Sequence, residues 1–230
     1  MHIRKMISKH YILILLVFLS NLLLATPQSA TFFHSEDSLL SKLTFPQIKG
    51  NTTTFINCSG IIKKNKKIEN VICYKNQAGD EIYIQEIYRV IRKSRFTPAQ
   101  INKKQVEVFV QFRVLFKQDD DGNEIKIFSN SGYEENVSAY GMNYTGAQRV
   151  IGKEEWLNNC PKYNRYRALS KTHIAPSGQA SNANLKLVNG ISLSDKCINS
   201  IVSSLNKSQY IPAFKANTAL PSTHIELYGN

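Results

Sequence analysis

The chain contains an internal repeat, and this feature constrains its fold more than any other. Residues 80–99 and 194–213 align without a gap at a shift of 114 residues, and six of the twenty columns are identical. The identical pairs are Ile84/Ile198, Ile87/Ile201, Lys93/Lys207, Ser94/Ser208, Pro98/Pro212 and Ala99/Ala213. The chain has 230 residues, which is room for one large or two small domains, so the repeat predicts two copies of one folding unit.

Each copy of the repeat reads as an amphipathic helix with a defined beginning and end. The apolar face of the first helix comprises Ile84, Ile87, Tyr88 and Ile91, at the spacing of a one-faced helix. Asp80 is its expected N-cap, and Pro98 should end the helical path because it moves the preceding residue away from helical angles. In the second copy Ser194 takes the place of the cap, and Cys197 lies on the buried face.

A long alternating stretch predicts the main strand of the first copy. Between Val106 and Phe116 every even position is apolar and several odd positions are polar, as expected for a strand with one buried face. A turn at Asp121-Gly122 should lead into a partner strand, Ile125–Phe128. The first copy therefore contains a helix followed by an antiparallel pair of strands.

The second copy repeats this order less regularly. A hairpin with Ser177-Gly178 near its turn precedes the helix. Downstream, after one extra residue, Ile225 and Leu227 align with Val110 and Phe112 and are expected to face the core. The sequence therefore predicts an α+β protein made of two small antiparallel sheets, each backed by one helix.

The first thirty residues read as an export signal. Arg4, Lys5 and Lys9 precede a fourteen-residue apolar run, Tyr11–Leu24, which is shorter than the roughly 20 residues of a membrane span. The alternative is an uncleaved N-terminal anchor. In either case we expect most of the chain to leave the cytoplasm.

A hairpin in the first copy places two cysteines opposite each other. The runs FINCSGII and IENVICY flank KKNKK, which predicts a turn with Asn65-Lys66 at its tip. Pairing Lys64 with Lys67 then sets Cys58 opposite Cys73, at a separation that a disulfide can span. A closed loop of about 15 residues contributes roughly 3 kcal/mol.

The remaining cysteines are Cys160 and Cys197, which pair by elimination. Four cysteines allow three pairings, and in an exported chain two disulfides are expected, the alternative being four buried thiols. No two of the four have the Cys-x₂₋₄-Cys spacing of a zinc site.

These observations divide the chain into five segments. We expect a signal peptide or anchor (1–30), a lead-in (31–50), the first unit (51–129), a linker with one short helix near Glu154–Leu157 (130–157), and the second unit (158–230).

The helix-to-strand corner resembles the TonB C-terminal domain of bacterial envelope proteins. The matching residues are Ser94, Phe96, Pro98 and Ala99 in the first unit and Ser208, Tyr210, Pro212 and Ala213 in the second. The resemblance implies a small antiparallel sheet backed by a helix. It also implies a bacterial protein, so we expect the exported chain in the periplasm or secreted, with an inner-membrane anchor as the alternative. The resemblance covers about two thirds of the chain beyond the leader, and the Pro-rich spacer of the energy transducers is missing because only seven Pro are scattered along the chain.

Binding, rather than catalysis, is the expected task. The sequence has no nucleophile motif, phosphate loop or zinc motif, so we expect no enzyme, cofactor or metal site. His173 and His224 could approach each other across the second sheet, but lone strand histidines are usually surface residues. The leading hypothesis is a non-catalytic envelope protein that binds a protein or peptide by strand addition, at Val106–Phe116 or Ile125–Phe128. The alternative is an inner-membrane-anchored, TonB-like energy-coupling component.

Charge suggests a second kind of partner. The net charge is +12, and Arg89, Arg92, Lys93 and Arg95 crowd the end of the first helix. These residues could contact an anionic envelope polymer. No aromatic residues are interleaved with them for base stacking, so nucleic acid is not expected.

Overall fold

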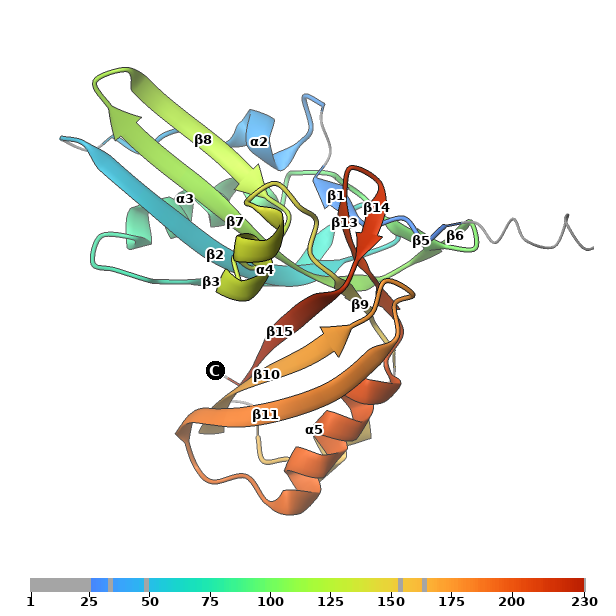
Figure 1. Ribbon diagram of the computed structural model, residues 1–230. Helices are drawn as coiled ribbons and strands as arrows, with labels where there is room; N and C mark the ends of the chain where they lie inside the picture. The colour runs from blue at the N-terminus through green and yellow to red at the C-terminus, as the bar shows by residue number, and fades with distance from the viewer. Residues whose placement is uncertain (1–25, 33–34, 48–49, 153–154, 163–164, 230) are drawn as a thin grey trace, which may run out of the picture.

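The computed structural model describes residues 26–32, 35–47, 50–152, 155–162 and 165–229. It is a mixed α+β structure of several antiparallel sheets with two disulfides, and four α-helices lie in the described ranges. Figure 1 shows two sheets, one above the other, with α5 packed under the lower one. We call residues 28–128 the first unit and residues 145–229 the second unit; the expected leader lies outside the described residues up to position 25.

The elements of the first unit are β1 (Thr31–Phe32), α2 (Leu39–Lys42), β2 (Thr52–Ile62), β3 (Ile68–Tyr74), α3 (Glu81–Ile91), β4 (Phe96–Thr97), β5 (Ala99–Ile101), β6 (Lys104–Val106), β7 (Val108–Asp119) and β8 (Gly122–Phe128). The connecting segment contains α4 (Glu134–Tyr140). The elements of the second unit are β9 (Gln148–Val150), the 3-10 helix η1 (Glu155–Asn159), β10 (Tyr166–Ile174), β11 (Ala180–Gly190), α5 (Asp195–Lys207), β12 (Tyr210–Ile211), β13 (Ala213–Lys215), β14 (Thr218–Leu220) and β15 (Ser222–Gly229).

The first sheet confirms the alternation of its central strand. Its order is β12-β9-β7-β2-β3, and β8 pairs with β7. The even positions of β7 from Val108 to Phe116 are buried, and they pack against α3 in one core with Ile87 and Ile91. The turn to β8 is one residue earlier than expected, because Asp119 pairs with Gly122.

The helix α3 is rotated relative to the expected face. Tyr83 and Val90 are buried, whereas Ile84 is only partly buried and Tyr88 is 38% exposed. The Tyr88 hydroxyl instead accepts a hydrogen bond from the Cys73 amide at the sheet edge (3.0 Å). Tyrosine tolerates this position because its ring covers apolar surface while its hydroxyl reaches a polar partner.

Asp80 does not cap the helix with its side chain, which corrects the sequence-based expectation. The residue is buried, and its carboxylate accepts hydrogen bonds from the amides of Asn76 and Gln77 (both 2.9 Å) and from the Thr54 hydroxyl (2.8 Å). Asp80 therefore fixes the loop that leads into α3 rather than the first turn of α3 itself. In the second unit, Ser194 does cap α5, by accepting from the Cys197 amide (3.3 Å).

Both expected disulfides are present, but the first is reached by a different turn. Lys63, not Lys64, bonds Lys67 across the tip (Lys63 N to Lys67 O, 2.8 Å), which shifts the strands by one residue. A β-bulge near Gly60 shifts them back, so Cys58 faces Cys73 as expected. Bulges insert one extra residue into one strand, which accounts for this compensation.

The two units share one topology. The order β3-β2-β7 in the first unit corresponds to β11-β10-β15 in the second, with α3 and α5 at the same point of the chain order. Gly60 pairs with Val110; Thr172, which lies 112 residues after Gly60, pairs with His224, which lies 114 residues after Val110. The two sheets therefore have the same register.

Local details also recur at the corners. Ser94 and Ser208 each donate a hydrogen bond to the carbonyl four residues earlier (3.0 and 2.8 Å). The turns after the two Pro-Ala corners have two residues with positive φ, namely Asn102 and Lys103 in the first unit and Ala216 and Asn217 in the second. Ile84 and Ile198 are both partly buried.

The correspondence extends upstream of the residues that the sequence aligned. β1 pairs with β4, and β9 pairs with β12 in the same way. Single bridges, Gln28 to Gln100 and Thr145 to Phe214, extend both contacts. Residues 28–32 are therefore part of the first unit, as residues 145–149 are part of the second.

The expected extra residue in the last strand does not exist. Ile225 and Leu227 were expected to face the core of the second unit, yet His224 and Glu226 are the buried residues, at 3% and 5% exposure. His224 occupies the register position of Val110, and Glu226 that of Phe112, which pairs with Cys58 as Glu226 pairs with Ser170. The apolar pattern gave the wrong frame because Glu226 is buried as one half of an ion pair, which is described below.

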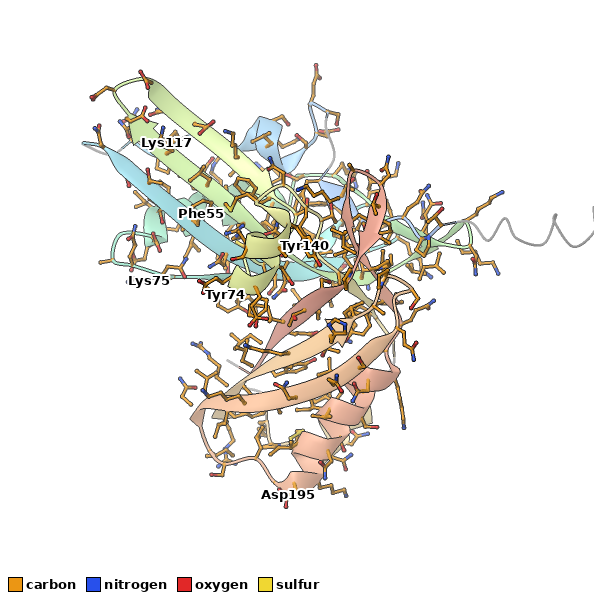
Figure 2. All side chains as sticks on the ribbon, viewed as in Figure 1. Phe55, Tyr74, Lys75, Lys117, Tyr140 and Asp195 are labelled. Atoms are coloured by element: carbon orange, nitrogen blue, oxygen red, sulfur yellow. A yellow bond between two sulfur atoms is a disulfide. The ribbon has the colours of Figure 1, made fainter. Side chains whose placement is uncertain are left out.

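Residues 130–157 contain more structure than the single expected helix. The 3-10 helix η1 lies near the expected position, and α4 and β9 are additional. Asn130 ties the segment to the first sheet by accepting from the guanidinium of Arg113 (3.0 Å), which is buried over the rings of Phe55 and Phe128. Figure 2 shows Phe55 on the upper sheet and Tyr140 where the two sheets meet. Within the described residues, no helix is long and apolar enough to cross a membrane.

Candidate functional site

Strand edges are the first candidate binding surfaces. Of the two segments expected to be edges, the structure leaves only one at an edge. Val106–Phe116 is not an edge, because β7 pairs with β2 on one side and with β8 and β9 on the other. Ile125–Phe128 belongs to β8, which pairs only with β7 in the described residues. β8 also contacts α2 and has an ion pair between Lys126 and Glu124 (2.5 Å). Charges on an edge strand oppose further pairing.

Two other edges are occupied by side-chain amides. Asn136 of α4 binds both backbone groups of Thr223 on the open side of β15: its Nδ2 donates to the carbonyl (2.7 Å) and its Oδ1 accepts from the amide (3.0 Å). Gln148 binds both backbone groups of Ala30, next to β1, in the same way (2.8 Å each). In each case a carboxamide takes the place of a neighbouring strand.

The strand β11 is a long edge strand of the sheet β11-β10-β15. It pairs with β10 on one side, and no strand in the described ranges pairs with its other side. Asn206 accepts a hydrogen bond from the Ala183 amide near its start (3.1 Å). Toward its end, Leu187 and Val188 are 38% and 54% exposed, followed by Ile191 at 39%. Lys186 is its one charged residue. The sequence does not mark this strand as an edge, because edges depend on the pairing order.

The four cations at the end of α3 fall into two groups, because only Arg89 has an acidic partner in the described residues. Arg89 is bound to Glu86 through Nε and Nη2 (both 2.7 Å). This arginine, against the opposing effect of burial and with help from Thr44, lowers the pKa of Glu86 to about 2. Arg89 is therefore neutralised, and it does not remain available for an anionic partner.

The other three cations are joined by the tip of the β2–β3 hairpin. Lys67 Nζ donates to the carbonyl of Arg92 (3.1 Å), and the amide of Phe96 donates to the carbonyl of Lys66 (3.0 Å). We call the resulting group the basic cluster; it comprises Lys64, Lys66, Lys67, Arg92, Lys93 and Arg95. Lys67 is partly buried and the other five are exposed, and none has an ion pair within the described residues.

Two acidic positions border the basic cluster. Lys42 binds Asp37 (2.8 Å) and, with smaller effects of Arg95 and Lys67, lowers the pKa of that carboxyl. Glu107 binds Lys63 (2.5 Å), which is therefore outside the cluster. The cluster keeps an excess of positive charge because each of these acids has its own lysine.

A buried ion pair lies in the core of the second unit. Arg149 of β9 binds Glu226 of β15 through Nε (2.8 Å) and Nη2 (2.6 Å), and His224 Nε2 lies 3.6 Å from the same carboxylate. Burial raises the pKa of Glu226, but the charge of Arg149 and the nearby His224 outweigh it, so the pKa is lowered. Burial raises the pKa of Tyr210, whose ring lies against His224 (5.4 Å between centroids).

The two histidines are not brought together. Thr172 pairs with His224, and His173 with Thr223, so the two rings lie on opposite faces of the sheet. His173 is exposed and His224 is buried, with Nδ1 3.0 Å from the carbonyl of Ala147. No group of three His, Cys, Asp or Glu side chains in the described part of the chain could hold a metal.

A polar groove of about 770 Å³ runs beside α5. Its lining includes Ser200, Ser203 and Ser204 of α5 and Asn159 of η1, whose amide donates to the Ser200 hydroxyl (2.9 Å). The α3 face at the equivalent place is occupied instead by Glu86 and Arg89, bound to Thr44.

No family model, curated protein or solved structure matches the chain.

Proposed function

We propose that the chain is an exported, non-catalytic binding or scaffold protein of the cell envelope, made of two TonB-C-like units. The observation that carries the binding proposal is the open outer edge of β11. Asn136 and Gln148 occupy two other edges, and β8 carries a charged pair. On the edge strand β3, the Cys73 amide is bound by Tyr88. β11 instead combines unpaired backbone with exposed Leu187 and Val188. An unpaired strand with apolar side chains is the geometry to which an extended peptide adds.

The direction of the amides identifies where a partner strand would bind. In the first unit, the amide of Cys73 points away from β2, since it donates to Tyr88. Leu185 holds the equivalent position in β11, and amides alternate in direction along a strand. The amides of Leu185 and Leu187 therefore face outward, and a partner would receive main-chain hydrogen bonds from them.

This proposal is tested by selecting short random peptides on the immobilised protein and measuring their affinity for two variants. Leu187→Pro removes the outward amide, and we expect it to weaken the selected peptides at least about tenfold, since several backbone hydrogen bonds depend on that register. Leu187→Ser is the matched control, because it removes the side chain and retains the amide. Equal loss in both variants would indicate a side-chain patch, and no loss in Leu187→Pro would reject β11.

Export is proposed on the leader and on the place of Gln28–Phe32 in the fold. Because Gln28 bridges to Gln100 and Ala30 is buried, cleavage must occur before Gln28, which favours the bond after Ala25. N-terminal sequencing of the exported form should therefore begin at Thr26. An intact Met1 would support the membrane-anchored alternative instead.

A further inference from the structure

We propose that the basic cluster binds the anionic phospholipid surface of a membrane. The cluster differs from the group of helix-end cations expected from the sequence. Arg89 is bound to Glu86 and does not belong to it, whereas the lysines of the hairpin tip, about 25 residues earlier in the chain, do. Six cations without an ion pair in the described residues then occupy one surface of the first unit. A cluster of four to eight lysines and arginines is the composition that binds anionic headgroups.

The second unit shows that the fold itself does not require these charges. At the equivalent positions of its hairpin tip stand Pro176, Gly178 and Gln179, in place of Lys64, Lys66 and Lys67. At the end of α5, Asn206, Lys207 and Gln209 replace the two arginines and one lysine. One cation thus stands where the first unit has six, although the turns have the same hydrogen bonds.

The acids near the cluster offset little of its charge. Asp37 is bound to Lys42, and Glu69 and Glu107 share Lys63 (3.9 and 2.5 Å from its Nζ), so the six cations outnumber the unbalanced acids. The five exposed cations project from a turn and a helix end, and none lines the groove beside α5. This arrangement suits an extended charged surface better than a small anion, which would need a pocket.

The place where the chain joins the leader favours a membrane as the partner. The described chain begins at Thr26, and Gln28 bridges to Gln100 while β1 pairs with β4. This first segment therefore runs beside residues 96–100, which directly follow Arg95. Lys103 and Lys104, which are exposed in the turn after Gln100, add positive charge just beyond the Gln28–Gln100 bridge. During export, the leader would hold this end of the first unit near the membrane.

The test measures binding of the full chain to lipid vesicles by sedimentation. Neutral phosphatidylcholine vesicles give the contribution of the leader, which all variants share, and vesicles with added phosphatidylglycerol give the electrostatic part. We expect tighter binding to the anionic vesicles, falling steeply with salt. The triple variant Lys64→Gln/Arg92→Gln/Lys93→Gln should lose roughly a hundredfold, because each cation contributes about fivefold.

The matched control is Lys162→Gln/Lys196→Gln/Lys207→Gln, which removes the same charge from exposed positions of the second unit outside β11. It should lose less than about fivefold, the effect of one cation at the surface. Equal losses in the two triple variants would show that only net charge matters and would overturn the proposal. So would an absence of preference for anionic vesicles, or binding to soluble dextran sulfate without binding to vesicles. None of these outcomes depends on β11, so the strand-addition proposal is tested separately.

Discussion

The cores of the two units differ at one place that the shared topology makes comparable. In the first unit, Phe32 packs against Phe112 and Phe96, with ring centroids 4.9 and 5.6 Å apart. In the second unit, Arg149, Glu226 and Tyr210 hold the same pairing positions, and the first two form a buried ion pair. One backbone arrangement therefore accepts either an aromatic cluster or a buried charge, provided that the charge is paired.

The largest effect is expected when this pair is broken. Arg149→Phe leaves the carboxylate of Glu226 buried without its arginine, and should lower the free energy of unfolding by about 3–5 kcal/mol. Urea titration followed by the fluorescence of Trp156, the one tryptophan of the chain, measures the second unit directly.

The double variant Arg149→Phe/Glu226→Phe transfers the residues of the first unit into the second and serves as the control. It should recover most of the loss, because replacing a buried ion pair by packed apolar residues is often neutral or stabilising. A double variant as unstable as the single one would show that the two cores are not interchangeable.

The disulfide that closes the longer loop should stabilise the fold more. Cys160–Cys197 closes 37 residues and Cys58–Cys73 closes 15, so the chain-entropy relation gives about 4 and about 3 kcal/mol. Alanine replacements of each pair, compared by thermal unfolding, should therefore destabilise the Cys160/Cys197 variant more. The reverse order would point to native contacts of the sulfur atoms rather than to loop closure.

Acid should unfold the second unit before the first. The pKa of Glu226 is lowered in the folded state, so its ionised form stabilises the fold above the ordinary value of 4.5, and this contribution is lost as the pH falls from there toward about 2. Glu86 has a lowered pKa in the first unit as well, but its partner Arg89 is 54% exposed, and an ion pair with a solvated partner contributes little. The protection of β10 amides against hydrogen exchange, relative to the intrinsic rate at each pH, should thus fall at a higher pH than that of β7 amides. A simultaneous fall in both strands would contradict the comparison.

The smallest effect concerns the edge of β15. Asn136→Ala leaves the amide and carbonyl of Thr223 without their partner, and should cost about 1–3 kcal/mol. Asn123→Ala, at an exposed position of β8, is the control and should change stability by less than about 0.5 kcal/mol. Equal thermal midpoints for the two variants would show that water replaces the Asn136 amide.

Much of the local structure follows from sequence patterns. The alternation in β7 and the corner at Pro98 predict their elements because each rests on a local rule. The pairing of Cys58 with Cys73 was predicted through the wrong turn, and it holds because the bulge near Gly60 compensates for the longer turn. Bulges depend on packing across strands, which one strand's sequence does not reveal.

The second unit was harder to predict, because its core breaks the rule that apolar residues face inward. Ile225 and Leu227 were expected to face the core, whereas Glu226 faces it instead. Its charge is paired with Arg149, which lies in a segment expected to be a linker. A search for the repeat further upstream, where Ala30 corresponds to Ala147, could have found β9 and hence Arg149. Identifying the edge strands also requires the pairing order, so the sequence alone does not show that β11, and not β7, is an edge.

The amide of Asn136 has a consequence for how such units can be joined. In the first unit, Phe109 of β7 pairs with Arg149 of β9, so that one unit receives the leading strand of the next. Thr223 is the matching position of β15, and there the amide holds both backbone groups. The second unit therefore cannot pair at Thr223 with the leading strand of another unit, as the first unit pairs at Phe109 with β9, unless α4 moves away.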